Sequence, residues 1–249
     1  NLFKENKEKF VLDTDRKGTR FLVDRSFVIK GLGTVVTGSV VSGIIRNDDN
    51  LALSNSDKII KIRGIRLDSI DISQAHINQR AALLVNVHHT DIKRGDYLFA
   101  VENKNLQHLD RFDASLTMSK LNTFNIGKNH QYHLYLGASH RVARVRHLGA
   151  DLYQISYNEP LSIHHGDRLI LRDPSATMTI AGGRVIDISV PRRNRASPQR
   201  LKVLEINRLN DEDALIGLIG EEPTGLHVRK FIENRNLTPV GFKSLVRET

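Results

Sequence analysis

The sequence predicts a mainly β protein with two consecutive β-barrels, followed by a helical domain that begins near residue 191. Short runs of β-branched and alternating apolar residues recur from Phe21 onward, separated by Gly and by Asn or Asp. Beyond about residue 190, proline-bearing helix starts and helical spacing replace them. Strands at this spacing are typical of barrels and sandwiches, and 249 residues can hold two or three domains.

Each barrel has its own set of strand-like runs. The first is expected over residues 19–104, with RFLVDRSFVI, TVVTGSVVSG, NLALS, KIIKIRGIRL, RAALLVNV and DYLFAV. The second is expected over residues 105–190, with FDASLTMS, QYHLYLG, RVARVRHL, LYQISY, DRLILRD and MTIAGGRVIDI. Because each set carries its own turn signals, we expect each to close separately.

Residues 191–249 are predicted to form a basic linker and helices. Ser197 followed by Pro198 is a helix start, after which Leu201, Leu204 and Leu209 can share one face. Thr238 and Pro239 repeat this signal before VGFKSLVRE, and GLHVRKFIENRN is expected to make a helix-turn-helix with that segment. The chain stops where a winged helix would add its β-hairpin, so a truncated winged-helix domain is expected.

Composition limits the classes of function. The chain has no cysteine, which excludes disulfides, cysteine-ligated metal centres and cysteine nucleophiles, and which suits the cytoplasm. No apolar run approaches the roughly 18 to 20 residues of a membrane span, so no membrane partner is expected. The net charge of +9 is spread over the whole chain and favours nucleic acid as a polyanionic partner.

The glycine-rich stretch KGLGTVVTGS raises the question of phosphate binding. A P-loop requires Lys after its last glycine, but Ser39 stands there. A dinucleotide fingerprint requires a third glycine where Val36 stands, and a helix where the run is β-branched. We therefore interpret the glycines as bends and close approaches in a β-barrel.

The same residues carry a family resemblance. VDRSFVIKGLGTVVTGSVVSGIIRNDDNLAL and LLVNVHHTDIKRGDYLF resemble the second domain of translational GTPases of the elongation factor Tu class. The Asp-Arg-x-Phe-x-x-Lys-Gly-x-Gly opening, together with GDRLILRDPSATMTIAGGRVID and the winged helix, resembles the selenocysteine-specific elongation factors. The resemblance covers nearly the whole chain, and this combination of motifs is specific.

The resemblance implies a binding module from the middle of such a factor. Residues 1–18 would be a linker from a GTPase domain that the sequence does not contain, since it has no P-loop, D-x-x-G or N-K-x-D motif. GTP and magnesium are expected in that domain, so this chain alone should have no catalytic residues, cofactor or GTPase activity. The implied partners are selenocysteyl-tRNA, the ribosome and, through further C-terminal domains, a messenger RNA hairpin at UGA codons. Whether the truncation is natural or a boundary of the sequenced piece is left open.

The resemblance also assigns the aminoacyl pocket to Asp24, Arg25 and Arg80. A selenol ionises to an anion, and two guanidiniums beside one carboxylate would favour it over a neutral serine hydroxyl. The alternative is an ordinary surface pair, because Asp24 and Arg25 leave opposite faces of a strand unless a bulge redirects one of them.

Basic side chains are candidates for contacts with the RNA backbone. Arg144 and Arg146 share a strand face with Val142, with Arg141 just before that strand. A solvated face fits them equally well. The linker arginines Arg192, Arg193 and Arg195 fit phosphate contact somewhat better.

The histidines suggest no metal site. The candidate pairs are His88 with His89, His130 with His133, and His164 with His165. Residues one or three apart in a strand point to opposite faces, so none of these pairs is a ready chelate. We therefore expect these histidines to face solvent or RNA.

Other functions remain as alternatives. A hydrolase built from HHTD or SIHHGD is disfavoured because no nucleophile, base and orienting group can be assembled from them. A DNA-binding regulator would read bases with GFKSLVRE. This is disfavoured, because the basic residues of that helix are only Lys243 and Arg247 and it has no Asn or Gln. Another translational GTPase and a generic basic RNA-binding module also remain.

Overall fold

The computed structural model of the chain describes residues 16–54, 56, 58–101, 109–120, 126–127, 130–221 and 225–249. The chain divides into two compact units. Among the described residues, the first unit holds 16–101 and 237–244, and the second holds 109–236 and 245–249. Each unit is described by itself.

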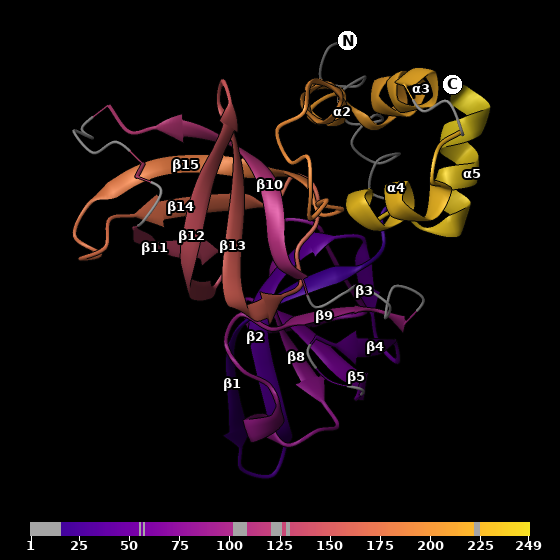
Figure 1. Cartoon of the computed structure of the whole chain (residues 1–249). Coiled ribbons are helices and arrows are strands. Elements are labelled where there is room, and N and C mark those ends of the chain that lie inside the picture. The colour runs from indigo at the N-terminus through magenta and orange to yellow at the C-terminus, as the bar shows by residue number, and fades with distance from the viewer. Residues whose placement is uncertain are drawn as a thin grey trace. The chain divides into compact units, whose positions relative to one another are not determined.

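The first unit is built on a closed antiparallel barrel (Figure 1). The strand order is β4-β9-β1-β2-β8-β5, and pairing of β4 with β5 closes this ring of six strands. Strand β6 extends β5, and β3 pairs with β7 in a separate two-stranded sheet. The elements are β1 (Arg20–Ile29), β2 (Gly33–Ser42), β3 (Ile44–Arg46), β4 (Asn50–Leu53), β5 (Ile59–Leu67), β6 (Ile70–Ile72), β7 (Gln74–His76), β8 (Arg80–Val85), the 3₁₀ turn η1 (His89–Asp91) and β9 (Tyr97–Ala100).

The inner face of this barrel is the alternating apolar set of its strands. Phe21 and Val23 of β1, Val36 and Val40 of β2, and Leu83 of β8 are buried in one core. The period-2 pattern predicts this, because alternate side chains of a strand point to the same face. Ser39, Arg80 and their outward neighbours are therefore left on the opposite face.

The glycine-rich stretch forms the β1–β2 hairpin. Gly31 and Gly33 have φ values of 81° and 114°, which side chains with a Cβ rarely adopt. Gly38 lies against the neighbouring strand, where a Cβ would stand 2.8 Å from the Phe21 ring and would meet the Leu22 carbonyl oxygen. This confirms the interpretation of the glycines as a barrel hairpin.

The second unit contains a second closed antiparallel barrel, with strand order β10-β13-β12-β11-β14-β15 (Figure 1). Its strands are β10 (Leu109–Met118), β11 (Gln131–Leu136), β12 (Ser139–Gly149), β13 (Leu152–Leu161), β14 (Arg168–Arg172) and β15 (Thr179–Asp187). Phe112, Tyr132, Ile155, Leu171 and Val185 are among its buried core residues. Two six-stranded barrels confirm the predicted fold class.

Four helices follow: α2 (Pro198–Asn207), α3 (Asp211–Glu221), α4 (Val228–Arg235) and α5 (Pro239–Glu248). Two predicted starts are confirmed, because the hydroxyl oxygens of Ser197 and Thr238 accept from the backbone N–H groups of Arg200 and Gly241. Leu209 was wrongly predicted to lie on the first helix, which ends before it. Within the described ranges, no helix is long and apolar enough to cross a membrane.

Helix α3 was not predicted from the sequence. Its signals are an Asn210 side chain that accepts from the Asp213 N–H at 2.8 Å and an acidic first turn. Gly217 and Gly220 weaken the helical pattern of this segment. The cap therefore identifies this helix better than the propensities of its residues.

Candidate functional site

The first strand of the first barrel contains a β-bulge at Asp24. Val23 pairs with Gly38 and Arg25 pairs with Thr37, so Asp24 is the extra residue between two consecutive pairs. An extra residue interrupts the alternation of side chains along a strand. The objection that Asp24 and Arg25 must leave opposite faces therefore does not hold for this strand.

The bulge brings Asp24 to Arg80, the first residue of β8. A terminal guanidinium nitrogen of Arg80 donates to Oδ2 of Asp24 at 2.5 Å, across 56 positions of sequence. The Arg80 side chain is 62% exposed and that of Asp24 is 27% exposed. The pair thus lies at the surface, where Arg80 keeps donors available to a ligand.

The strand register places Arg25 on the same face. Arg25 lies opposite Thr37, and Thr37 lies opposite Ala82. Directly paired residues of antiparallel strands share a face, and so do residues two apart along one strand. Arg25, Ala82 and Arg80 therefore face outward together, so the structure brings all three predicted pocket residues onto one surface of the barrel.

An apolar hollow of about 390 Å³ continues this surface. Phe27, Val35 and Leu84 form the next row of cross-strand pairs beyond Arg25, Thr37 and Ala82. The other lining residues are Ile29, Leu32, Asn47, Arg63, Gly64, Ile65, Arg66, Asp71, Ile72 and Ala82. The hollow thus has apolar walls and a polar rim, which is the usual character of a ligand site.

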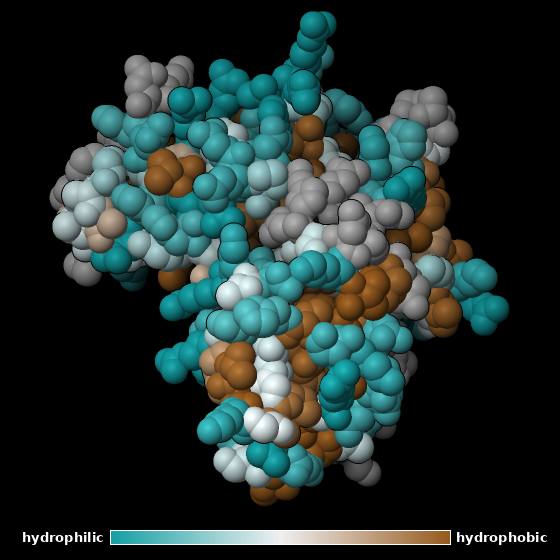
Figure 2. Space-filling view, turned by 90° about the horizontal axis from the view of Figure 1, so that it is seen from below, coloured by the Kyte–Doolittle hydropathy of each residue, from teal (hydrophilic) through white to brown (hydrophobic). Residues whose placement is uncertain are grey.

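Several apolar side chains around the hairpin are exposed. Phe27, Ile29 and Leu32 are between 38% and 44% exposed. Figure 2, which views the molecule from the side of the β1–β2 hairpin, shows hydrophobic residues gathered on this barrel among hydrophilic ones. This feature was not predicted from the sequence, although the run FVIKGL carries the signal in an excess of apolar residues beside the turn.

The arginines of the second barrel differ in their availability. Arg144 and Arg146 of β12 are exposed, as predicted, and their side chains make no ion pair with a described residue. Arg141 lies within β12, not before it, and contacts the Glu159 carboxylate at 3.4 Å. Arg144 and Arg146 are therefore the more available pair.

The linker arginines also separate into two kinds. Arg192 and Arg193 are exposed. Arg195 donates from Nε to the Arg192 carbonyl at 3.0 Å and from a terminal nitrogen to Oε1 of Gln154 at 3.0 Å. Its guanidinium thus helps to hold the linker on the second barrel.

A buried ionic network lies beneath this linker. Asp113 of β10 and Asp187 of β15 are paired across the two strands, and Arg200 of α2 donates to both carboxylates, at 2.5 and 2.7 Å. Burial raises the pKa of Asp113, against the attraction of Arg200. The pKa of Arg200 is raised because the two carboxylates outweigh the effect of its burial. Aspartates in the otherwise apolar runs FDAS and VIDI are the sequence signal for this network.

The histidines take several environments. His133 and His140 stack with their ring centroids 5.0 Å apart, and Nδ1 of His133 lies 2.7 Å from Nε2 of His140. His164 is only 1% exposed, so the expectation that it faces solvent or RNA is wrong. It lies in the connection between β13 and β14, and the next residue, His165, hydrogen-bonds the carbonyls of Asn207 and Asn234 in the helical segment. Among the residues that the structure describes, no group of three or more His, Asp or Glu side chains could hold a metal ion.

Comparison with known proteins agrees with these features. Residues 111–192 match the family described as the beta-barrel domain of selenocysteine-specific elongation factor. The chain is 29% identical over 232 residues to the selenocysteine-specific elongation factor of Escherichia coli K12, covering 92% of this chain and 37% of that protein. It is 33% identical over 199 residues to that of Haemophilus influenzae, covering 76% of this chain and 31% of that protein. The chain therefore spans about a third of the length of these relatives.

Solved structures show the same fold. A crystal structure of a bacterial selenocysteine-specific elongation factor, EF-Sec, aligns with a TM-score of 0.73 at 22% identity, over 94% of this chain and 39% of that one. The elongation factor SelB of Methanococcus maripaludis in its apo form aligns with a TM-score of 0.60 at 21% identity, over 72% of this chain and 44% of that one.

The two consecutive barrels thus have the same fold as the aligned part of these elongation factors. More particularly, the chain is a SelB-like elongation factor region that includes the beta-barrel domains.

Proposed function

We propose that this chain is the part of a selenocysteine-specific elongation factor that holds selenocysteyl-tRNA. The observation that carries the proposal is the common outward face of Asp24, Arg25 and Arg80, which the bulge and the strand register create. In the intact factor, this binding would serve GTP-dependent delivery to the ribosome at UGA codons, aided by a messenger RNA hairpin.

The charges on this face favour an anionic aminoacyl group. Two guanidiniums and one carboxylate together carry a net charge of about +1. The Arg25 side chain is exposed and makes no hydrogen bond or ion pair with another described residue. A selenolate would neutralise this excess, whereas the hydroxyl of a seryl group would leave it uncompensated.

The neighbouring hollow would receive the terminal base of the tRNA. It begins one row of strand pairs from Arg25, which is within reach of the last nucleotide when the aminoacyl group lies at Asp24 and Arg80. The Phe27 ring offers a stacking surface, and Arg63 on the rim can approach a phosphate.

The second barrel would contact the tRNA backbone. Arg144 and Arg146 are two residues apart on the exposed side of β12. Contacts of this kind position an RNA without reading its sequence. Discrimination between aminoacyl groups would therefore depend on the first barrel.

The resemblance implies a GTP, but the glycine-rich stretch of the described residues does not form a site for its phosphates. KGLGTVVTGS forms a strand hairpin, without a helix N-terminus that could hold phosphates. GTP and magnesium would bind a GTPase domain N-terminal to these barrels in the intact factor.

The test is the affinity of the intact factor, with GTP, for selenocysteyl-tRNA and for seryl-tRNA on the same tRNA. We expect wild type to prefer the selenocysteyl form, and Arg80→Ala to remove the preference while the affinity for seryl-tRNA is kept. Lys61→Ala is the matched control, because Lys61 forms an exposed pair with Asp48 at 2.9 Å in the same barrel. If wild type binds both tRNAs with equal affinity, and both affinities fall in parallel as the salt concentration rises, the chain is only a basic RNA-binding surface.

A further inference from the structure

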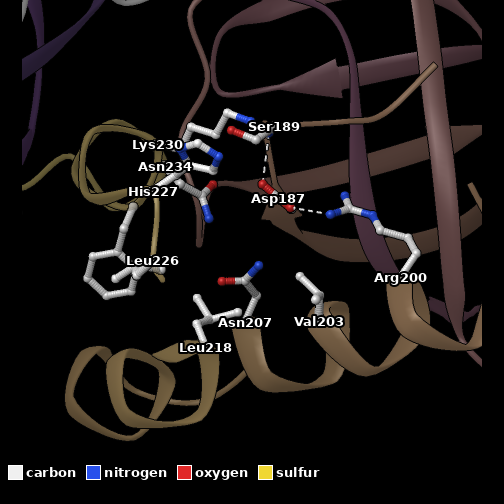
Figure 3. A pocket seen from close by; sticks show the side chains of 11 residues that line it. Asp187, Ser189, Arg200, Val203, Asn207, Leu218, Leu226, His227, Lys230 and Asn234 are labelled. Carbon is white, nitrogen blue, oxygen red and sulfur yellow. Dashed lines mark hydrogen bonds and ion pairs between the residues drawn. The ribbon is translucent and has the colours of Figure 1, made fainter. Parts of the chain in front are cut away.

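A second hollow, of about 140 Å³, lies in the second unit between the end of β15 and helices α2, α3 and α4 (Figure 3). Val203, Leu218, Leu226 and Phe231 supply its apolar walls. Its polar lining comes from Asp187, Ser189, Arg200, Asn207, His227, Lys230 and Asn234. It uses none of the residues of the proposed aminoacyl pocket.

The feature of the hollow that calls for a ligand is the amide of Asn207. Asn207 is 4% exposed, and its Oδ1 is buried without a hydrogen-bond partner among the described residues. Figure 3 shows its amide pointing into the hollow. A buried polar atom without a partner is costly, and such atoms in native proteins call for a bound water, ion or ligand.

Two other polar side chains of the wall are already hydrogen-bonded within the protein. Asn234 accepts from the Ile188 N–H at 3.2 Å and donates to the Ile186 carbonyl at 3.4 Å. Asp187 accepts from Arg200 at 2.7 Å and from the Ser189 N–H at 2.8 Å. Of the two asparagine amides in the wall, that of Asn207 is therefore the one available to a ligand.

The mouth of the hollow favours an anion. Helix α4 begins at Val228, and its N-cap residue, His227, makes no side-chain capping hydrogen bond. Lys230, in the first turn, is exposed and makes no ion pair with a described residue. The free N–H groups and positive end of a helix attract phosphate, and a nearby lysine strengthens that attraction.

We propose that this hollow binds one unpaired nucleotide of an RNA. The base would enter between Phe231 and the leucines, and its edge would present a donor beside an acceptor to the amide of Asn207. An asparagine amide matches such an edge. A cavity of about 150 Å³ holds one benzene-sized ring, so the hollow accommodates a base ring while the phosphate stays at Lys230 and the start of α4.

The experiment is a titration of the full chain with each of the four nucleoside monophosphates, followed through its backbone amide signals by NMR. We expect shifts confined to α2, α3, α4 and the end of β15, with a dissociation constant on the order of 0.1 to 1 mM for the preferred base. Asn207→Leu should weaken binding at least about 10-fold. Its melting temperature should not fall, since leucine removes an unsatisfied amide from a partly apolar wall.

Lys230→Gln separates the phosphate contact from the base contact. It should weaken binding of the monophosphate several-fold and leave binding of the corresponding nucleoside unchanged. Lys243→Gln, at an exposed lysine of α5 that does not line the hollow, should change neither. Absence of shifts with all four monophosphates at about 10 mM, or shifts that persist in Asn207→Leu, would overturn the proposal. Because the probes carry no aminoacyl group, this result does not depend on that of the tRNA experiment.

Discussion

Arg200, near the start of α2, donates to Oδ2 of Asp113 at 2.5 Å, although 87 positions of sequence separate the two residues. The Asp113 carboxylate is fully buried in β10, and the same guanidinium also reaches Asp187 of β15. Two paired aspartates in neighbouring strands would repel each other without it. The first helix is thus attached to the second barrel by a buried charge network.

Removal of this guanidinium should strongly destabilise the second unit. Arg200→Met leaves two buried carboxylates without their cation, for which a loss of about 3–5 kcal/mol in the free energy of unfolding is expected at neutral pH. The loss should shrink as pH falls toward about 4, because the carboxyls can then fold in their protonated form. Urea unfolding followed by tyrosine fluorescence measures this, since four of the five tyrosines lie in β11 and β13 of the second barrel.

Arg208→Met is the control for this prediction. Arg208 pairs with Asp151 at 2.8 Å, but the two side chains are 35% and 39% exposed. A pair of this exposure contributes about 0–1 kcal/mol. Equal losses for the two variants would mean that the Arg200 network does not stabilise the fold more than a surface pair does.

Gly38 should tolerate no side chain. A Cβ there would meet the Leu22 carbonyl oxygen and lie 2.8 Å from the Phe21 ring, both in the tightly paired neighbouring strand. Gly38→Ala should therefore cost about 3 kcal/mol or more, at the upper end of overpacking effects. Gly64→Ala, whose Cβ would come no closer than 3.8 Å to Leu84, should change stability little. Chemical denaturation measures the free energy of unfolding of both variants. A loss for Gly38→Ala as small as that for Gly64→Ala would contradict the close approach at Gly38.

Asp173 should make the protein sensitive to acid. Hydrogen bonds from the Ser175 hydroxyl, the Met178 N–H and the Thr177 hydroxyl hold the pKa of its carboxyl well below the usual range. A carboxyl with a lower pKa in the folded state binds fewer protons there than in the unfolded chain. Its stabilising contribution is therefore complete above an unfolded pKa of about 3.9, and it is lost progressively as pH falls from there through the lower pKa of the folded state.

Melting temperatures between pH 3 and pH 7 test this contribution. Asp173→Asn should lower the melting temperature at pH 7, and the difference from wild type should be smaller at pH 3, where part of the charge contribution has been lost. A difference that stays constant over this range would show that the loop depends on the shape of the side chain and not on its charge.

Arg144 and Arg146 should contribute to RNA affinity through phosphate contacts alone. Each change to Ala in the intact factor should weaken tRNA binding for seryl and selenocysteyl forms alike. It should also reduce the slope of log affinity against log salt by about 1. Arg141→Ala should have a smaller effect, because Arg141 is already engaged by Glu159. Unchanged slopes for both β12 variants would remove this face from the tRNA interface.

Much of the fold was predictable from local patterns. Alternation in runs such as TVVTGSVV marks one face for the core, because the period of a strand is set by backbone geometry alone. The starts at Ser197 and Thr238 were readable for the same reason, since a cap is formed by residues adjacent in sequence. Helix α3 was not predicted, because the low helix propensity of its glycines outweighs the helix-start signal of its cap.

The sequence by itself determined the fold class, the helix starts and the resemblance that singles out Asp24, Arg25 and Arg80. Only the tertiary structure decided that these three residues share a face, because a bulge depends on how the partner strand pairs and not on the strand itself. It likewise joined Arg200 to Asp113 and left the amide of Asn207 facing a hollow. Such relationships arise between residues distant in sequence, and local patterns do not encode which distant side chains will meet.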